Sequence, residues 1–165
     1  MRLVQVSAGP RLDDIRKLFR EYQRWLGVDL CFQSFEEELA ALPGKYGPPR
    51  GRLLLALEEG RPAGCVALRP IAGGACEMKR LFVRDEFRGL GIGRRLAEAI
   101  VKAGREMGYR SMKLDTVPKL KEALGLYASM GFEPTEPYVF NPLEGAIFLE
   151  KKLAARRKTV SRPEQ

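Results

Sequence analysis

The sequence predicts an α/β (α+β) domain built on one mixed, mostly antiparallel, twisted sheet of six to seven strands flanked by about four helices. Three apolar segments in close succession, 53–57, 63–69 and 76–83, are typical of an antiparallel meander of strands. A glycine loop and an amphipathic helical pattern separate the last of these strands from the next one, at 111–116. Because a strand reached through a helical crossover lies parallel to the strand before it, the centre of the sheet should contain one parallel pair.

The N-terminal part of the chain predicts one strand and two helices. Residues 2–7 alternate between apolar and polar side chains, as a half-buried strand does. Apolar residues then recur at helical spacing from Ile15 to Leu26, which indicates an amphipathic helix that ends near Gly27. The segment 34–37 has capping-box spacing and predicts a second, short helix that Pro43-Gly44 stops.

The remaining elements are predicted in the same way. The apolar segment 28–32 is expected to fold back over the core. An apolar stripe from Leu96 to Met107 predicts a helix after the glycine loop, and residues 120–127 predict another helix, which stops at Gly131. Two final strands, at 138–140 and 146–150, are expected to close the sheet around a turn at Asn141-Pro142.

The composition is that of a single domain that does not enter a membrane. A chain of 165 residues is long enough to bury one core. No apolar run reaches the length of about 20 residues that spans a bilayer, and no signal peptide is evident, so we expect a cytoplasmic location and no membrane partner. The three cysteines have no paired spacing and the chain has no histidine, so the sequence gives no indication of a disulfide framework or a metal site. The absence of histidine also excludes a histidine general base.

The net charge of +8 is concentrated at the C-terminus. Residues 151–165 contain six basic residues and one acidic residue, and so carry +5 of the +8. We therefore expect a folded domain at 1–153 and a basic, flexible tail at 154–165. Short basic tails are more often solvated than bound to a partner, so we do not expect nucleic acid as a partner. A nucleic-acid-binding protein that uses this tail is the alternative that we rank last.

The segment 88–93, with the sequence Arg-Gly-Leu-Gly-Ile-Gly, lies between the predicted strand 76–83 and the helix that follows. Such a junction leaves backbone N–H groups without helical partners and lets an anion approach them closely. A dinucleotide fingerprint counted from Gly89 needs a glycine where this sequence has Arg94, and the Gly-Lys-Ser/Thr of a P-loop is absent. The loop therefore predicts a phosphate or pyrophosphate site of another kind.

Three stretches together resemble the GNAT superfamily of acetyl-CoA-dependent N-acetyltransferases. They are the Arg-x-x-Gly-x-Gly motif, the preceding Glu77–Val83, and Leu126-Tyr127 followed by Gly131-Phe132. The resemblance covers roughly 3–153 and implies a single-domain GNAT fold, in which the central parallel pair splays apart to admit acetyl-CoA. The residues that it places at the cofactor are Leu81, Phe82, Val83, Arg88, Gly89, Leu90, Gly91, Ile92, Gly93 and Arg94. A local distortion of the strand at 81–83 is expected to offer an N–H to an oxyanion.

Acetyl transfer to an amine requires two proton transfers. A primary amine with a pKa near about 10.4 must lose a proton before it attacks, and a thiolate whose conjugate acid has a pKa near about 8.5 leaves more readily if an acid protonates it. By resemblance, Glu77 is the base and Tyr127 the acid. Glu77 should share a strand face with Lys79, Leu81 and Val83. The alternatives are a strand-end carboxylate paired with a lysine for Glu77 and a packed core ring for Tyr127.

The acceptor is the part of the reaction that the sequence defines least. The resemblance places Asp29, Phe32, Tyr138 and Asn141 around it. Aromatic rings with one carboxylate suit a small-molecule amine or a peptide amine better than a phosphorylated molecule. The predicted function is therefore N-acetylation of an unidentified primary amine by direct attack in a ternary complex. The alternative is an acyl-CoA-binding sensor without chemistry, and the sequence leaves both a monomer and a homodimer open.

Overall fold

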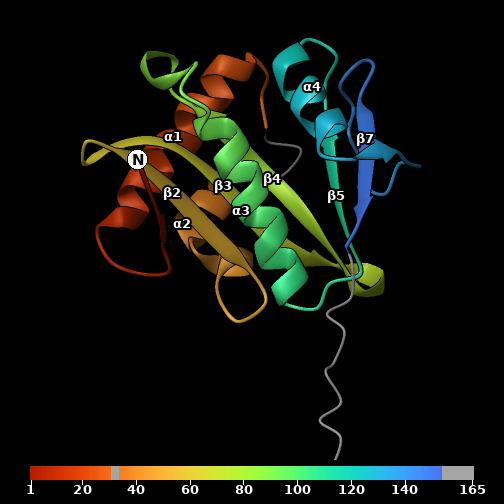
Figure 1. Ribbon diagram of the computed structural model, residues 1–165, viewed down its shortest axis with the longest axis horizontal. Helices are drawn as coiled ribbons and strands as arrows, with labels where there is room; N and C mark the ends of the chain where they lie inside the picture. Colours follow the sequence, from red (N-terminus) through yellow and green to blue (C-terminus); the bar gives the residue numbers. More distant parts are fainter. Residues whose placement is uncertain (31–33, 154–165) are drawn as a thin grey trace, which may run out of the picture.

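The computed structural model describes residues 1–30 and 34–153, which form one seven-stranded sheet in the order β1-β2-β3-β4-β5-β7-β6 (Figure 1). The predicted mixed sheet is confirmed, since β4 and β5 pair in parallel and every other neighbouring pair is antiparallel. The strands are β1 (Arg2–Gln5), β2 (Arg52–Glu58), β3 (Arg61–Ile71), β4 (Ala75–Val83), β5 (Ser111–Thr116), β6 (Glu133–Pro134) and β7 (Ile147–Lys152). The α-helices are α1 (Arg11–Leu26), α2 (Phe35–Ala41), α3 (Ile92–Glu106) and α4 (Lys121–Ser129).

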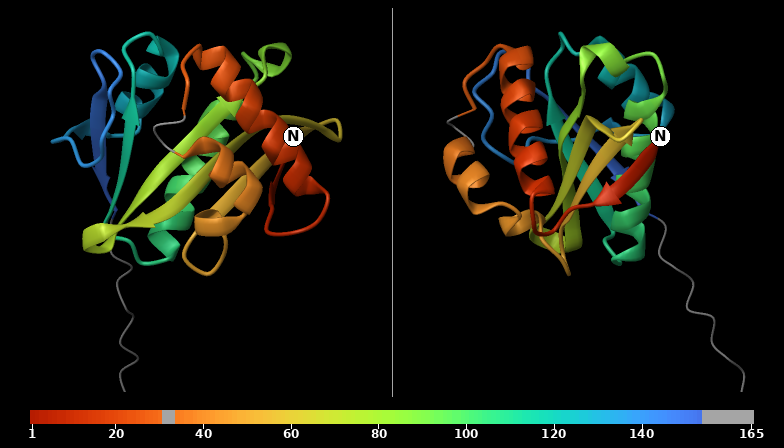
Figure 2. Two further views of the ribbon diagram at one scale, coloured as in Figure 1. Left: turned by 180° about the vertical axis from the view of Figure 1, so that it is seen from behind. Right: turned by 90° about the vertical axis from the view of Figure 1, so that its left-hand side faces the viewer.

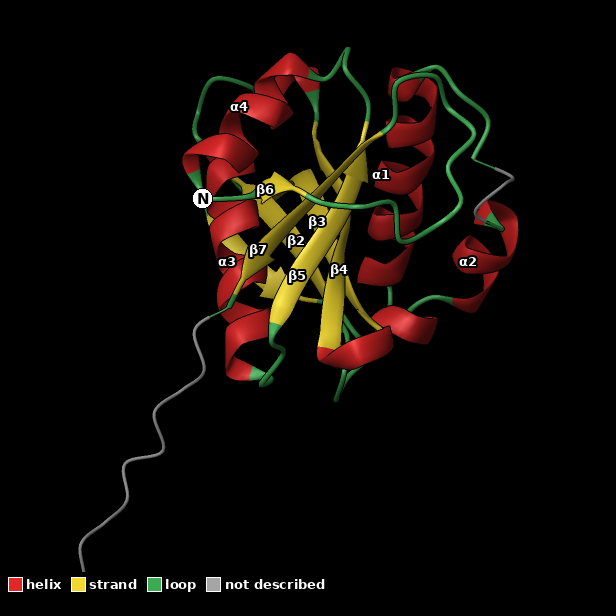
Figure 3. Ribbon diagram, turned by 90° about the vertical axis from the view of Figure 1, so that its right-hand side faces the viewer, coloured by secondary structure: helices red, strands yellow, loops and turns green. Residues whose placement is uncertain are grey.

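The helices cover both faces of the sheet. Helices α1 and α2 lie on one face, and α3 and α4 lie on the other (Figures 2 and 3). Each face has its own apolar core: Phe19 and Leu39 belong to the core under α1 and α2, whereas Leu96 and Ile100 belong to the core under α3. The strand β2, which is apolar on both faces, contributes to both cores, as its sequence predicts.

Several local predictions need correction. The expected strand at 138–140 is wrong, because β7 pairs instead with the two-residue strand β6. Pro137 and Pro142 flank the expected strand and lack the N–H that a ladder requires, and the Tyr138 ring packs against Phe148. The short helix α2 is present, but Ser34 makes no side-chain cap hydrogen bond. The tail at 154–165 lies outside the described residues. Of the helices in the described part of the chain, none has the length and apolarity that a bilayer crossing requires.

The parallel pair diverges after a short ladder. Strands β4 and β5 pair only from Ala75 to Glu77 on β4 and from Ser111 to Lys113 on β5. Beyond these residues the two strands separate, so the predicted splay is confirmed (Figure 1). The edge of β4 from Met78 onward consequently has no strand beside it on the β5 side, within the part of the chain that the structure describes.

A β-bulge reverses the faces of β4. Lys79 pairs with Ala67 and Phe82 pairs with Cys65, so β4 has one residue more than β3 in this interval. Arg80 occupies the bulge with a φ of 60°. As a result, Leu81 packs on the α3 side of the sheet, and the expected shared face of Glu77, Lys79, Leu81 and Val83 is wrong beyond Lys79.

Candidate active site

The glycine loop presents backbone N–H groups to solvent at the start of α3. Gly89 and Gly91 adopt φ values of 80° and 77°, which are left-handed conformations that glycine adopts without strain. Within the described chain, the N–H groups of residues 89 to 94 donate no hydrogen bond, and α3 has no side-chain cap. The Arg88 N–H is different, since it donates to the carbonyl of Asp85 at 3.2 Å. Six consecutive amides are therefore available to an anion.

A cleft of about 510 Å³ runs from this loop along the edge of β4, and we call it the cofactor cleft. Its walls include the loop glycines, the side of β4 from Leu81 to Val83, and α4 residues such as Leu126. The single tryptophan of the chain, Trp25, stands at the rim with 41% of its surface exposed, and Arg88 lies over its ring at 4.6 Å from the ring centroid. The cleft thus combines anion-binding amides with a mostly apolar wall.

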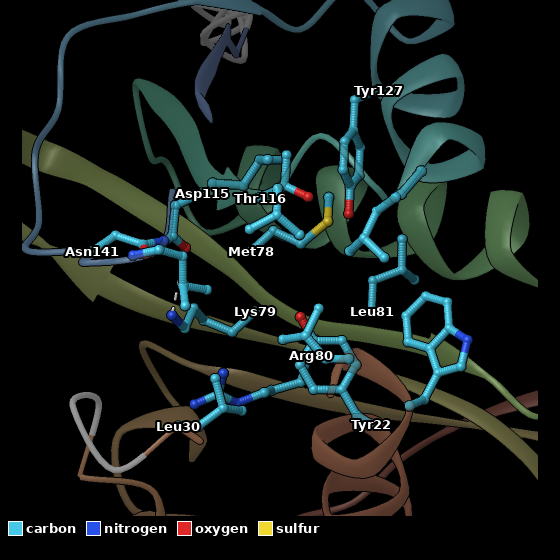
Figure 4. Close-up of a pocket in the computed structure, with 17 residues that line it drawn as sticks. Tyr22, Leu30, Met78, Lys79, Arg80, Leu81, Asp115, Thr116, Tyr127 and Asn141 are labelled. Atoms are coloured by element: carbon cyan, nitrogen blue, oxygen red, sulfur yellow. Dashed lines mark hydrogen bonds and ion pairs between the residues drawn. The ribbon is translucent and has the colours of Figure 1, made fainter. Parts of the chain in front are cut away.

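The cofactor cleft continues into a narrow space of about 60 Å³ between the diverging strands, which we call the strand slot (Figure 4). The two spaces share Trp25, Leu81, Leu120 and Ala123. The slot passes between β4 and β5, because residues of α1 line it on one face of the sheet and residues of α4 line it on the other. The slot therefore has lining residues from both faces of the sheet.

Tyr127 enters the strand slot from α4. Its ring packs edge to face against Phe132, 5.7 Å away between centroids, and its hydroxyl points into the slot (Figure 4). The hydroxyl makes no hydrogen bond with any described residue. Burial raises the pKa of Tyr127 well above that of an ordinary tyrosine, so the hydroxyl stays protonated. An O–H that points into the slot without a partner is suited to donate to a group that enters the slot.

A charged cluster stands opposite Tyr127 in the slot. Lys79 of β4 lies with its Nζ 3.6 Å from the Asp115 Oδ1 of β5, and the Asn141 Nδ2 donates to the Asp115 Oδ2 at 3.0 Å (Figure 4). Desolvation by burial lowers the pKa of Lys79, and the neighbouring Glu77 and Asp115 carboxylates oppose this effect. These side chains put polar groups at the end of the slot that lies away from the glycine loop.

Glu77 does not line the strand slot. It is completely buried, and its carboxylate accepts hydrogen bonds from the Arg69 Nε at 2.7 Å and from the Tyr138 hydroxyl at 2.6 Å. Burial and then the Glu77 charge raise the pKa of Tyr138, so its hydroxyl remains a donor. Glu77 borders a third space, of about 220 Å³, which we call the charged cavity. Lys79 lines both the charged cavity and the slot, and so lies between them.

The structure brings some predicted site residues together and separates others. Arg94 donates to the Ser129 hydroxyl of α4 at 2.9 Å and does not line the cofactor cleft. Leu90 is 60% exposed on the loop, also outside the cleft wall. Asp29 is exposed and, among the described residues, is not part of the walls of these three spaces. Phe32 lies outside the described residues.

Sequence patterns missed several side chains at these spaces. Asp115 follows a pattern that could have been used, because ligands gather at the carboxyl ends of parallel strands. Trp25 belongs to the apolar stripe that predicts α1, and that pattern does not indicate a place in a site. Glu38, Lys45 and Arg69 come from three different elements, and no local spacing connects them. Only the packing of α2 and of the turn at 44–46 against β3 brings them to one place.

Comparisons with known proteins give one consistent result. The family model described as the Acetyltransferase (GNAT) family matches residues 12–132. An uncharacterized N-acetyltransferase of Schizosaccharomyces pombe is 46% identical over 145 residues, which are 87% of this chain and 89% of that protein. The crystal structure of a GNAT-family acetyltransferase from Staphylococcus aureus superimposes with a TM-score of 0.76 at 19% identity, covering 93% of this chain and 100% of that chain. PaiA N-acetyltransferase from Thermoplasma acidophilum, in complex with coenzyme A, has a TM-score of 0.71 at 18% identity, with 92% and 99% covered.

Proposed function

Because the chain belongs to the GNAT family of acetyltransferases, we propose that it moves an acetyl group from acetyl-CoA to the primary amine of a small-molecule or peptide acceptor. The transfer is direct, within a ternary complex. The observation that carries this proposal is the convergence of three sets of groups on two adjoining spaces: the loop amides, the edge of β4 that has no strand beside it, and the Tyr127 hydroxyl.

Acetyl-CoA fits the cofactor cleft on chemical grounds. The amides of residues 89 to 94 suit its diphosphate, with Arg88 adding a cation at the cleft wall. The N–H and C=O groups on the free edge of β4, from Leu81 to Val83, suit the amide groups of its pantetheine arm, as they would an added strand. The arm would then direct the thioester into the strand slot, which Tyr127 lines.

The chemistry then requires one bond to form and one to break. The acceptor ammonium first loses a proton to Glu77, directly or through water, and the neutral nitrogen bonds to the acetyl carbon. The carbon–sulfur bond breaks, and the departing sulfur takes a proton from Tyr127. Tyr127 recovers this proton as the second N–H proton of the former amine is released. The products are an N-acetyl amine, coenzyme A and one proton.

The test is acetyl-CoA consumption across a panel of amines, amino acids and N-terminal peptides, read as free-thiol release and as the mass of the N-acetyl product. We expect at least one acceptor to give both signals in equal amount. Binding of acetyl-CoA without thiol release for any acceptor would favour the alternative of a non-catalytic acyl-CoA sensor. Absence of binding would contradict both.

A further inference from the structure

The charged cavity has a surplus of positive charge. Its wall contains three cations and two carboxylates, which are Lys45, Arg69, Lys79, Glu38 and Glu77. Two further charged residues of the described chain touch this group from outside the wall: Arg80 pairs with Glu38, and Asp115 pairs with Lys79. Counting both, four cations face three carboxylates, and one positive charge remains.

The two carboxylates of the cavity wall already form hydrogen bonds and ion pairs with groups other than Lys45. Glu38 accepts hydrogen bonds from the Tyr46 hydroxyl at 2.6 Å and from the Arg80 guanidinium at 3.1 and 3.3 Å. Glu77 is held by Arg69. The Lys45 Nζ lies 3.8 Å from the Glu38 carboxylate, which these other groups also contact. The surplus charge is therefore located at Lys45.

Lys45 is placed to receive an anion. Its side chain is 43% exposed at the cavity wall, so it can be reached from solvent. Desolvation by partial burial lowers the pKa of Lys45, and the nearby Arg69 charge lowers it further. A negative group beside Lys45 would relieve both effects, because an opposite charge favours the protonated amine.

The charged cavity also offers a place for the acceptor nitrogen. Lys79 lies between the cavity and the strand slot, and each oxygen of Glu77 makes one hydrogen bond, which leaves further lone pairs for an ammonium group. An anionic group near Lys45 and an ammonium near Glu77 would thus lie on one small molecule. We propose that the acceptor carries its own carboxylate next to its amine, as an α-amino acid does, and that Lys45 binds this carboxylate.

The size and rim of the cavity favour a free amino acid over a peptide. Its volume of about 220 Å³ is below the range of about 300 to 1,000 Å³ that is usual for ligand pockets. In the N-terminal residue of a peptide, moreover, the α-carboxyl group is an uncharged amide. Val139 and Phe140 complete the cavity wall, and Phe140 is 76% exposed. We therefore expect an apolar amino-acid side chain at this rim.

The experiment compares acceptors that differ only in the carboxylate. This inference rests on the proposed function, so the assay is the same thiol release, with phenylalanine, phenylalaninamide and 2-phenylethylamine as acceptors. Rates are corrected for the fraction of neutral amine at the assay pH. We expect kcat/KM for phenylalanine to exceed those of the two analogues without a carboxylate by about tenfold or more, since a charge-assisted contact is lost in both.

The matched variant is Lys45→Gln, with Lys45→Arg and Lys102→Gln as controls. Lys45→Gln should raise the KM for phenylalanine by about tenfold and leave the KM values for 2-phenylethylamine and acetyl-CoA unchanged. Lys45→Arg should retain most of the preference. Lys102→Gln removes an exposed charge on α3 and should change nothing.

The outcomes separate this inference from the proposed function. If 2-phenylethylamine is acetylated as well as phenylalanine, or if the preference survives in Lys45→Gln, the carboxylate site is wrong while the acetyltransferase activity stands. If none of the three acceptors, nor any other amine of the wider panel, releases thiol, the proposed function fails and this inference fails with it. Should Lys45→Gln not fold, the comparison of acceptors with the unchanged protein still decides.

Discussion

The hydroxyl of Tyr127 points into the strand slot without a partner, and in the proposed reaction the departing sulfur accepts its proton. Tyr127→Phe should lower kcat by about 100-fold and leave the dissociation constant of acetyl-CoA unchanged, because only the proton donor is removed. Since burial raises the pKa of Tyr127, kcat of the unchanged protein should not fall through loss of this proton at any pH up to about 10. Steady-state kinetics and calorimetric titration measure these quantities.

Tyr109→Phe is the matched control for this variant. The Tyr109 hydroxyl donates to the Arg50 carbonyl at 2.6 Å, and the residue lies outside the slot wall. Its loss should reduce stability by about 1 kcal/mol without lowering kcat. Equal kcat values for Tyr127→Phe and the unchanged protein would remove Tyr127 from the mechanism.

Glu77 is tested by its pH signature, because a purely structural role would not produce one. Glu77→Gln preserves the shape that Arg69 and Tyr138 contact but cannot accept a proton. We expect kcat/KM at neutral pH to fall by a factor of about 100 to 10,000. The residual rate should rise with pH until the acceptor amine itself is neutral, whereas the unchanged protein should level off earlier. A pH–rate profile that keeps its form in Glu77→Gln would make Glu77 a structural ion-pair residue.

Sequence reasoning reached residues that belong to a local motif and missed residues that meet across the sheet. Tyr127 follows from its neighbours in the chain, and so does Glu77. Arg69 became visible only with the strand register, and the register also gives Asp115 its partner, since each of the two pairs with a residue of another strand. The roles of Glu77 and Tyr127 stay predictions until the variants above are measured.

At the scale of the element, the bulge in β4 depends on a glycine in β3. A Cβ at Gly64 would lie 2.5 Å from the carbonyl oxygen of Phe82, a backbone atom that cannot move without shifting the edge of β4. Gly64→Ala should therefore destabilise the fold by about 1 to 3 kcal/mol and weaken acetyl-CoA binding, because that edge forms the cleft wall. Urea unfolding and calorimetric titration test the two effects.

Gly125→Ala supplies the opposite control. Gly125 is exposed on α4, and a Cβ there would meet nothing within 4 Å. Alanine should stabilise this helix by about 0.5 to 1 kcal/mol and leave cofactor binding intact. If Gly64→Ala were as stable as the unchanged protein, the close approach at the bulge would not be a constraint on the fold.

Most elements could be predicted because their own residues carry the signal. The helices α1, α3 and α4 have apolar stripes, and β2 is apolar throughout. The segment 138–140 has strand-forming residues, but it does not join the sheet, because prolines flank it and Tyr138 finds its partner in Glu77. The bulge lies at Arg80, next to the distortion expected at 81–83, and Arg80 pairs with Glu38 of α2, which local spacing in β4 does not indicate.

At the scale of the whole molecule, buried acids predict a loss of stability at alkaline pH. Burial raises the pKa values of six groups, and that of the Cys76 thiol reaches about 12. The groups are Tyr22, Tyr46, Cys65, Cys76, Tyr127 and Tyr138. Because the folded state holds these protons more tightly, their contribution is complete below the unfolded pKa values, about 8.5 for thiols and about 10 for tyrosines, and it is lost as pH rises above them.

The lysines act in the opposite direction. Burial lowers the pKa values of Lys45 and Lys79, so their contribution to stability rises with pH up to the unfolded value of about 10.4. Because six acids lose stability with rising pH and only two amines gain it, the melting temperature should fall steadily from about pH 9 to about pH 11. Cys76→Ala should reduce the slope of this fall. A melting temperature that is constant or rising over this range would contradict the assignment of these groups as buried and protonated.

The sequence predicted the sheet as a whole, including the parallel pair, because a crossover helix leaves few topologies. It did not predict how the three spaces connect. The cofactor cleft lies beside one loop, whereas the charged cavity needs α2, the turn at 44–46, β3 and β4 at the same time. That arrangement depends on long-range packing, which local periodicity does not encode.

The central claim is that acetyl-CoA lies in the cofactor cleft with its thioester in the strand slot. A crystal structure of the protein soaked with acetyl-CoA tests it most directly. We predict the diphosphate on the amides of residues 89 to 94, the pantetheine arm along the edge of β4, and the thioester sulfur within hydrogen-bond distance of the Tyr127 hydroxyl. A cofactor bound elsewhere, or a loop whose amides pair with the protein's own carbonyls while the cleft stays empty, would contradict the account.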